Sequence, residues 1–293
     1  MYTLIKRETK ALLNKMMRER RYRKQLVLTK KCHPKLDEYL QNNECLKDSK
    51  KGRRCFILGN GPSINNLDFA LLANEDVFTV NQLARRDDYC LLKANYHVWA
   101  DPIFFEIDIN KEENQELIQS FFRVKTAVGS PICFLPIEAE DFVVQIGLSN
   151  VIDINYFYGH KDFDYCNEDI DLTKESYSFG TVVQYAISIA LYMGYSEIYL
   201  LGCETTGILN VINNFLHRTI TDYAYNVSEE EKKRMLGMMT KYDMEHEFKS
   251  WGIVLHQYKL LGKYCTDREI ELINCTPSSI IDSLAYMDLS DVL

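Results

Sequence analysis

One short segment, Ile57-Leu-Gly-Asn-Gly-Pro-Ser63, combines residue types that can hold a nucleotide. Glycines let backbone N–H groups approach a ligand closely, and a helix that begins after such a turn favours an anion at its N-terminus. The segment is not a complete G-x-G-x-x-G dinucleotide motif, because Ile64 stands where the third glycine would be. The alternative is an ordinary strand–turn–helix corner capped by Ser63. We predict that the nucleotide contacts Gly59, Asn60, Gly61, Pro62 and Ser63.

A pair of amides, Asn81 and Gln82, follows the next apolar run, Asp76–Val80. In open α/β sheets, ligands bind beyond the carboxyl ends of the strands. We therefore predict that both side chains belong to the same site as the glycine turn, where Asn81 could read a sugar or the edge of a base. The alternative is an asparagine that only caps a turn.

Two further residues could take part in a reaction. Glu204 follows the apolar run 197–201 and could bind ribose or acceptor hydroxyls, coordinate magnesium in a phosphoryl-transferring enzyme, or only cap a turn. His246 lies among carboxylates in Asp243-Met-Glu-His-Glu247, which could orient it as a general base. A surface histidine is the alternative, and His256 is the second contender for the base.

The sequence predicts no metal site and no secreted disulfide framework. Asp162-Phe-Asp164 and Asp169-Ile-Asp171 match the Asp-x-Asp pattern that holds a divalent ion on a diphosphate, but they lie in an acidic, turn-rich stretch and not directly after an apolar strand. The nine cysteines include no C-x-x-C motif and are odd in number, which is typical of reduced thiols in a cytoplasm. No apolar run approaches the roughly 18 residues of a membrane span, and residues 1–30 lack the apolar core of a signal peptide.

Short apolar runs alternate with helical patterns along residues 54–293. The clearest helix is 181–195, which is apolar nearly all round and ends near Gly194. A helix is also expected within 65–72 and a small lid within 205–250, and 46% apolar residues suffice for a large core. The alternation predicts an α/β fold whose mostly parallel sheet is covered by helices on both faces. The strands are expected at 54–58, 76–80, 96–100, 132–135, 151–154, 197–201 and 270–273.

Charge divides the chain into a basic arm and an acidic body. Residues 1–35 carry 12 Lys and Arg against two acids, whereas residues 36–293 carry 22 against 40. We expect a helical arm over 1–40, a polar linker over 41–53 and one catalytic domain over 54–293. The arm could pack on the body or on a sister chain, or lie on an anionic membrane surface. Nucleic acid is the least favoured partner, because the acidic body would repel phosphate.

Six motifs occur in order along the chain: Gly59-Asn-Gly-Pro-Ser63, Asp76-Val-Phe-x-x-Asn81-Gln82, Asp101-Pro102 with Phe104-Phe105-Glu106, Gly194-Tyr-x-Glu-Ile-Tyr-Leu-x-Gly202, Tyr223-Ala-Tyr225 and Asn274-Cys-Thr-Pro-Ser278. Together they resemble motifs of the bacterial lipooligosaccharide sialyltransferases, which use CMP-sialic acid. They also resemble the related hydroxymethylpterin diphosphokinase-like family, many members of which sit in bacterial surface-polysaccharide loci. The likeness covers about residues 53–293 and leaves out the basic arm.

The resemblance implies a Rossmann-like glycosyltransferase fold and roles for particular residues. Asn60 and Asn81 match donor-binding asparagines, and Gly180 matches a turn beside the donor. His246 lies in the neighbourhood of the family's catalytic base. Pro136 stands where the sialyltransferases present a serine. The candidates for the tyrosine that steadies the departing phosphate are Tyr165 and Tyr177.

The function that the resemblance implies is an inverting transfer of a sialic-acid-like or other keto sugar from a CMP donor to a bacterial surface glycan precursor. No cofactor is required by this reaction. The alternatives are an ATP-dependent, Mg²⁺-using diphosphokinase that acts on a pterin-like alcohol, and a non-catalytic nucleotide-sugar binder. We expect a cytoplasmic homo-oligomer, with peripheral contact to the inner face of the membrane through the arm and with no nucleic-acid partner.

Overall fold

The computed structural model describes residues 2–163, 169–217, 224–225, 227, 231–234, 237 and 241–293, with side chains from residue 13 onward. Its centre is an eight-stranded parallel sheet in the order β10-β9-β8-β1-β2-β3-β4-β5. This confirms the predicted α/β class, and the sheet is Rossmann-like. The strands are β1 Arg54–Leu58, β2 Asp76–Val80, β3 Tyr96–Val98, β4 Ile132–Pro136, β5 Ile154–Phe157, β8 Glu197–Leu201, β9 Glu271–Asn274 and β10 Ala285–Tyr286.

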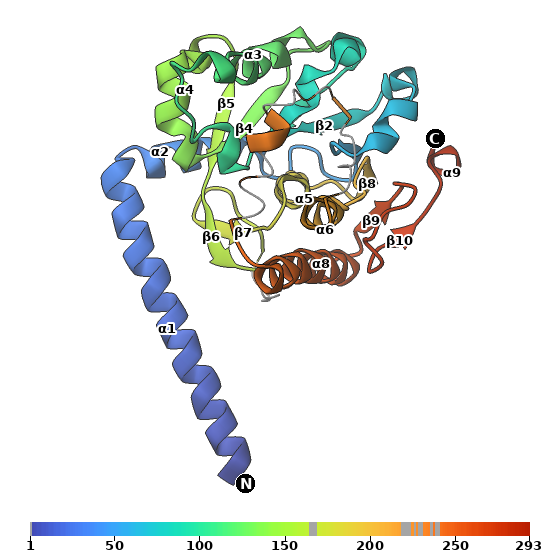
Figure 1. The fold of residues 1–293 in the computed structure, drawn as a ribbon. Coiled ribbons are helices and arrows are strands. Elements are labelled where there is room, and N and C mark those ends of the chain that lie inside the picture. Colours follow the sequence, from blue (N-terminus) through green and yellow to red (C-terminus); the bar gives the residue numbers. More distant parts are fainter. Residues whose placement is uncertain are drawn as a thin grey trace.

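Helices cover both faces of the sheet (Figure 1). Side chains of successive strand residues point alternately to the two faces and enter two separate cores. Phe56 and Leu58 of β1 belong to the core under α2 (Leu36–Gln41), α3 (Gln115–Arg123) and α4 (Glu140–Ile146). Cys55 and Ile57 face the opposite core, under α5 (Val182–Tyr192) and α8 (Met244–Thr266). Burial on both faces explains why the strand sequences read as continuous apolar runs.

Smaller elements connect these layers. Outside the main sheet, β6 (Gly159–Asp162) pairs with β7 (Ser176–Ser178). The helix α6 (Gly207–Phe215) packs against α8, and the short α9 (Leu289–Val292) lies near the C-terminus (Figure 1). The 3-10 helices are Asn42–Leu46, Pro62–Asn66, Phe69–Leu72, Asn81–Arg85, Asp87–Leu91, Pro102–Phe104, Glu112–Asn114, Val124–Thr126, Ile137–Ala139 and Leu148–Asn150.

The sequence predicted two helices beside the candidate site, and only one of them forms as an α-helix. α5 has a capping box, in which Thr181 and Gln184 satisfy each other's backbone N–H groups, and Gly194 follows its end at φ +87°. The helix expected within 65–72 is wrong, because extended backbone at Leu67 separates two short 3-10 helices. The glycine turn therefore carries no long helix whose dipole would attract an anion.

The arm is the helix α1 (Tyr2–Cys32), which extends away from the body (Figure 1). Its second half is tied to the β5–β6 region. The Thr29 and Tyr158 hydroxyls lie 2.9 Å apart, and the backbone N–H of Asp162 donates to the Tyr22 hydroxyl at 2.8 Å. None of the helices in the described part of the chain is both long and apolar enough to cross a membrane.

Residues 41–53, the expected linker, are folded against the body. Asn43 is fully buried, and its amide donates to the backbone oxygens of Tyr156 at 2.8 Å and Leu172 at 3.0 Å. The Tyr192 hydroxyl donates in turn to the backbone oxygen of Asn43. These contacts join the end of the arm to the sheet, so the stretch is not an extended tether.

Candidate functional site

The strand order changes direction between β1 and β8. From β1 the chain builds the sheet outward through β2, β3, β4 and β5, and from β8 it builds the other side through β9 and β10. The loops that leave β1 and β8 therefore diverge, and a crevice opens between the carboxyl ends of these two strands. In open parallel sheets this switch point is where ligands bind.

A cavity of about 180 Å³ lies at this switch point. It is bounded by the loops after β1 and β8, the start of α5, the start of α6 and the inner side of α8. Its described lining consists of Asn60, Gly61, Pro62, Val80, Thr181, Val182, Val183, Gly202, Cys203, Glu204, Thr205, Thr206, Gly207, Asn210, Trp251 and Tyr258. Three predicted site residues, Asn60, Gly61 and Pro62, meet Glu204 here although they lie more than 140 positions before it.

The glycine turn is fastened to the loop after β8 by its own backbone. Gly59 N–H donates to Leu201 O and Gly61 N–H to Gly202 O, each at 2.8 Å. A Cβ at Gly59 would overlap the Gly202 carbonyl oxygen. The two glycines are thus needed so that one loop can approach another, and these amides are already engaged. The sequence had suggested instead that the glycines let these N–H groups approach the nucleotide.

Glu204 completes the junction between the loops. Its side chain is buried, and its Oε1 accepts a hydrogen bond of 2.7 Å from the backbone N–H of Ser63. A Cβ at Gly61 would overlap the carboxylate. Ser63 itself does not line this cavity but a neighbouring one of about 230 Å³, on the side of β10 and α9. The carboxylate of Glu204 therefore occupies the place beside the turn where an anionic ligand was expected.

Two buried acceptor atoms of the cavity residues lack donors. Asn60 Oδ1 and Glu204 Oε2 are both inaccessible to solvent and have no hydrogen-bond partner among the residues that the structure describes. Leaving a buried polar atom unpaired costs about 1–3 kcal/mol, more when the atom is charged. Both atoms accept and cannot donate, so the ligand chemistry that satisfies them is a hydroxyl or an amino group.

Asn81 is held in an unusual conformation by a buried histidine. Its φ is +45°, in the left-handed region, and its backbone oxygen accepts a hydrogen bond of 2.9 Å from His97 Nε2. Because a carbonyl only accepts, Nε2 carries the proton, and Nδ1 accepts from the hydroxyls of Thr79 at 2.7 Å or Tyr89 at 3.2 Å. Burial lowers the pKa of His97 to about 3, so the ring is neutral.

The amide pair does not enter the cavity. Asn81 Oδ1 accepts a long hydrogen bond of 3.4 Å from Ala100 N–H, and Gln82 Oε1 accepts one of 2.8 Å from the Ser120 hydroxyl. Gln82 is fully buried, and neither amide belongs to the described lining. Val80, which directly precedes Asn81, does line the cavity.

The residues expected beside the donor have different surroundings. Gly180 N–H donates to Gln257 Oε1 at 2.8 Å, and a Cβ there would press on Val254 of α8, so this glycine permits close packing of the turn on the helix. Tyr177 is buried in edge-to-face contact with Phe163, at a ring distance of 5.0 Å, and is not part of the lining. Tyr165 lies outside the described residues.

His246 lies on the surface at the start of α8. Its backbone N–H is capped by Asp243 Oδ1 at 2.8 Å, and its ring stacks on Tyr242 at 4.1 Å. The side chain is exposed, as is that of His256, and neither residue belongs to the described lining. Among the described lining residues, Glu204 is the one that carries a carboxylate.

Some lining residues were not predicted. Trp251 and Tyr258 are seven positions apart on α8, which places them on the same side of the helix. Burial raises the pKa of Tyr258, whose hydroxyl lies 3.4 Å from that of Thr181. The spacing of Trp251 and Tyr258 could have indicated that they share one face of α8. No feature of the sequence near α8 indicated that this face meets the glycine turn. Among the residues described, no three His, Cys, Asp or Glu side chains are grouped so that they could hold a metal ion.

The fold and the position of the cavity define this protein as a Rossmann-like parallel α/β protein with a small cavity at the switch point. No protein-family model and no curated protein matched the sequence. A solved structure, the MAf glycosyltransferase from Magnetospirillum magneticum AMB-1, is similar with a TM-score of 0.44 and 12% identity, over 88% of this chain and 39% of that one. The chain thus spans about two fifths of that protein's length, and this likeness is too slight to transfer an activity.

Proposed function

We propose that this protein is a glycosyltransferase that binds the sugar-bearing part of a nucleotide-sugar donor in the cavity between β1 and β8. The observation that carries this proposal is the pair of buried, unpaired acceptors, Asn60 Oδ1 and Glu204 Oε2, at the switch point of a parallel sheet. Hydroxyl groups of a sugar or of ribose supply the missing donors. Trp251 offers an aromatic surface on which the apolar face of a sugar ring can rest.

The size of the cavity favours one ring over a whole nucleotide. About 180 Å³ is smaller than the roughly 300 Å³ at which pockets for complete small-molecule ligands begin. The remainder of the donor then lies outside this hollow. We propose in addition that the donor is a CMP-linked keto sugar and the acceptor a surface glycan precursor, because the six sequence motifs resemble those of the sialyltransferases.

The cavity residues suggest how such a transfer would proceed. The acceptor hydroxyl attacks the anomeric carbon, the bond from that carbon to the phosphate oxygen breaks, and the phosphate leaves with the electron pair. We propose that Glu204 Oε2 takes the proton of the acceptor hydroxyl, because Ser63 N–H stabilises the carboxylate through Oε1 while Oε2 has no donor among the described residues. His246, the base predicted from the sequence, is exposed and outside this lining.

Two hydroxyls can assist the departure of the phosphate. Tyr258 and Thr181 both line the cavity. Because burial raises the pKa of Tyr258, its hydroxyl keeps its proton and can donate to a developing negative charge. We propose Tyr258 for the role for which the family resemblance made Tyr165 and Tyr177 the candidates. The scheme uses no metal ion.

A binding screen tests the proposal. The protein is heated with CMP, CDP, UDP, GDP or ATP, each with Mg²⁺ and with EDTA, and its unfolding temperature is recorded. A ligand present at about 100 times its Kd adds roughly 2.7 kcal/mol of stability. We expect stabilisation by CMP that survives EDTA, followed by release of CMP from the matching donor. Stabilisation by ATP alone, and only with Mg²⁺, would favour the diphosphokinase alternative, and binding without turnover would favour a nucleotide-sugar binder.

A further inference from the structure

The helix α1 presents to solvent a face that carries both apolar and basic side chains. Every third or fourth residue turns toward the body: Arg18, Tyr22, Leu26 and Thr29 are half-buried, and His33 beyond the helix is buried. The opposite side is open. Five large apolar side chains on the helix are each more than half exposed: Leu13, Met16, Met17, Val27 and Leu28.

The open side consists of two apolar pads with cations between them. Leu13, Met16 and Met17 form the first pad, and Val27 and Leu28 form the second, about 16 Å further along at 1.5 Å per residue. Arg20 and Lys24 lie between the pads on the same side of the helix, since 3.6 residues make one turn. Residues 13–31 hold eight Lys and Arg and one acid, Glu19.

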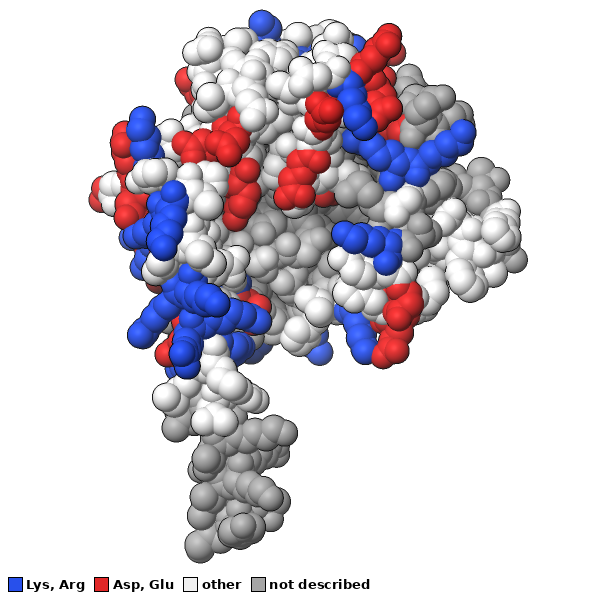
Figure 2. All heavy atoms as spheres, turned by 60° about the vertical axis from the view of Figure 1, so that its left-hand side comes forward, with Lys and Arg blue, Asp and Glu red and all other residues white. Residues whose placement is uncertain are grey.

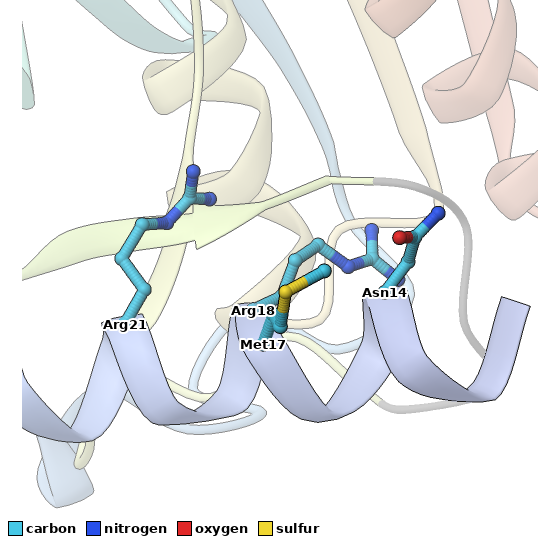
Figure 3. A pocket seen from close by; sticks show the side chains of 4 residues that line it. All are labelled: Asn14, Met17, Arg18 and Arg21. Carbon is cyan, nitrogen blue, oxygen red and sulfur yellow. The ribbon is translucent and has the colours of Figure 1, made fainter. Parts of the chain in front are cut away.

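The basic side chains gather where the helix meets the body, as Figure 2 shows. On one flank, Asn14, Met17, Arg18 and Arg21 line an open hollow of about 620 Å³, and the polar ends of Asn14, Arg18 and Arg21 point to the same side of the helix (Figure 3). Arg21 pairs with Asp162 at 3.0 Å, but more than half of each side chain is exposed. Ion pairs of this exposure add little stability, so Arg21 can exchange Asp162 for another anion.

We propose that this face of α1 docks on an anionic lipid bilayer. The apolar pads enter the boundary between headgroups and acyl chains, while the long side chains of Arg20 and Lys24 reach up to the lipid phosphates. The exposed Arg21 on the flank meets a further headgroup. The acidic body stays off the membrane, because it contacts the opposite side of the helix through Tyr22 and Thr29.

A second copy of the chain fits this face less well. A helical pair needs an apolar seam, and a symmetric seam here would bring Arg20 and Lys24 of both copies together without acids to pair them. A lipid surface supplies the opposite charge along its whole extent. Each Lys or Arg near such a surface strengthens binding about fivefold.

Co-sedimentation of the full-length protein with vesicles tests the inference. Vesicles of phosphatidylcholine with about 30 mol% phosphatidylglycerol are compared with pure phosphatidylcholine, at about 0.05 M and 0.5 M NaCl. The variant Arg20→Glu/Lys24→Glu is compared with Lys93→Glu/Lys125→Glu, which makes the same change of charge at exposed body positions. A third variant, Met17→Gln/Leu28→Gln, removes apolar contact from exposed positions.

We expect the wild type and the body variant to bind anionic vesicles at low salt, and binding to fall at high salt. The arm variant should bind at least about 30-fold more weakly, and the Met17→Gln/Leu28→Gln variant several-fold more weakly. Equal binding to neutral vesicles, or equal loss in the body variant, would overturn the proposal. So would a dimer in sedimentation velocity that only the arm variant dissociates, because a second copy would then occupy the face. None of these measurements depends on the proposed glycosyl transfer.

Discussion

The substitution Gly61→Ala tests the most specific feature of the site, the contact between the glycine turn and Glu204. The backbone at Gly61 has φ −74° and ψ 153°, which alanine adopts without strain. The cost must therefore come from the new methyl group. That group would overlap the Glu204 carboxylate and lie 2.7 Å from the Gly202 carbonyl oxygen.

The expected loss of stability follows from what must move. To make room, Glu204 must leave its place and give up the hydrogen bond from Ser63 N–H at 2.7 Å. A hydrogen bond to a charged group contributes about 1.5–3 kcal/mol, whereas replacing glycine by alanine restrains the unfolded chain and returns about 0.4–1 kcal/mol. With the added pressure on Gly202 O, we expect Gly61→Ala to lower the free energy of unfolding by about 2–3 kcal/mol.

Urea unfolding, followed by circular dichroism, measures this change, and a double-mutant cycle assigns it. In the background Glu204→Ala the carboxylate is gone, so Gly61→Ala should cost less than about 1 kcal/mol. The matched control is Gly252→Ala in α8, where no atom lies within 4 Å of the new Cβ and a gain of up to about 1 kcal/mol is expected. An equal cost of Gly61→Ala in both backgrounds would show that the carboxylate does not depend on this glycine.

Three further predictions concern other residues. Glu204→Gln should lower kcat about 10²–10⁴-fold, while His246→Asn should retain most activity; the reverse pattern in steady-state kinetics would make His246 the base. Burial lowers the pKa of His97 to about 3, below its unfolded value of about 6.5. Between these two values the unfolded chain binds a proton that the native chain does not. The contribution of the neutral ring to stability is therefore full above about pH 6.5 and falls toward pH 3. Urea unfolding from pH 7 to pH 4 should show a slope in His97→Gln that is shallower by up to about 1.4 kcal/mol per pH unit, and an unchanged slope would refute the assignment. Asn43→Ala, which removes the amide that donates to the backbone oxygens of Tyr156 and Leu172, should cost about 2 kcal/mol in the same assay, whereas a cost near zero would mean that residues 41–53 are only a tether.

Much of the fold could be predicted from local patterns. The apolar runs at 54–58, 76–80 and 197–201 are strands with those same limits, because a strand buried on both faces must be apolar along its length. The helix α5 was predicted to within a turn, since its cap residues and Gly194 lie in the sequence beside it. The basic arm was also visible, because a run of charged residues with helical spacing needs no distant partner to form.

The site depended on contacts that no local pattern contains. Gly61 and Glu204 meet only because β8 pairs with β1, and strand order is decided by which crossover connections pack together. The same pairing turns the predicted nucleotide-binding turn into a junction whose amides are already engaged. It also creates the two unpaired acceptors on which the proposed function rests.

Tertiary packing also determined the rotation of each element about its axis. Helix α8 turns Trp251 and Tyr258 into the cavity and leaves His246 in solvent, although the sequence singled out the histidine for its acidic neighbours. Asn81 follows the strand that was expected, but the buried ring of His97 holds its backbone and the side chain stays outside the cavity. Residue types thus determined which chemistry the chain can offer. Packing of the core determined which of those groups share one hollow, because burying apolar surface outweighs the preference of any single polar side chain.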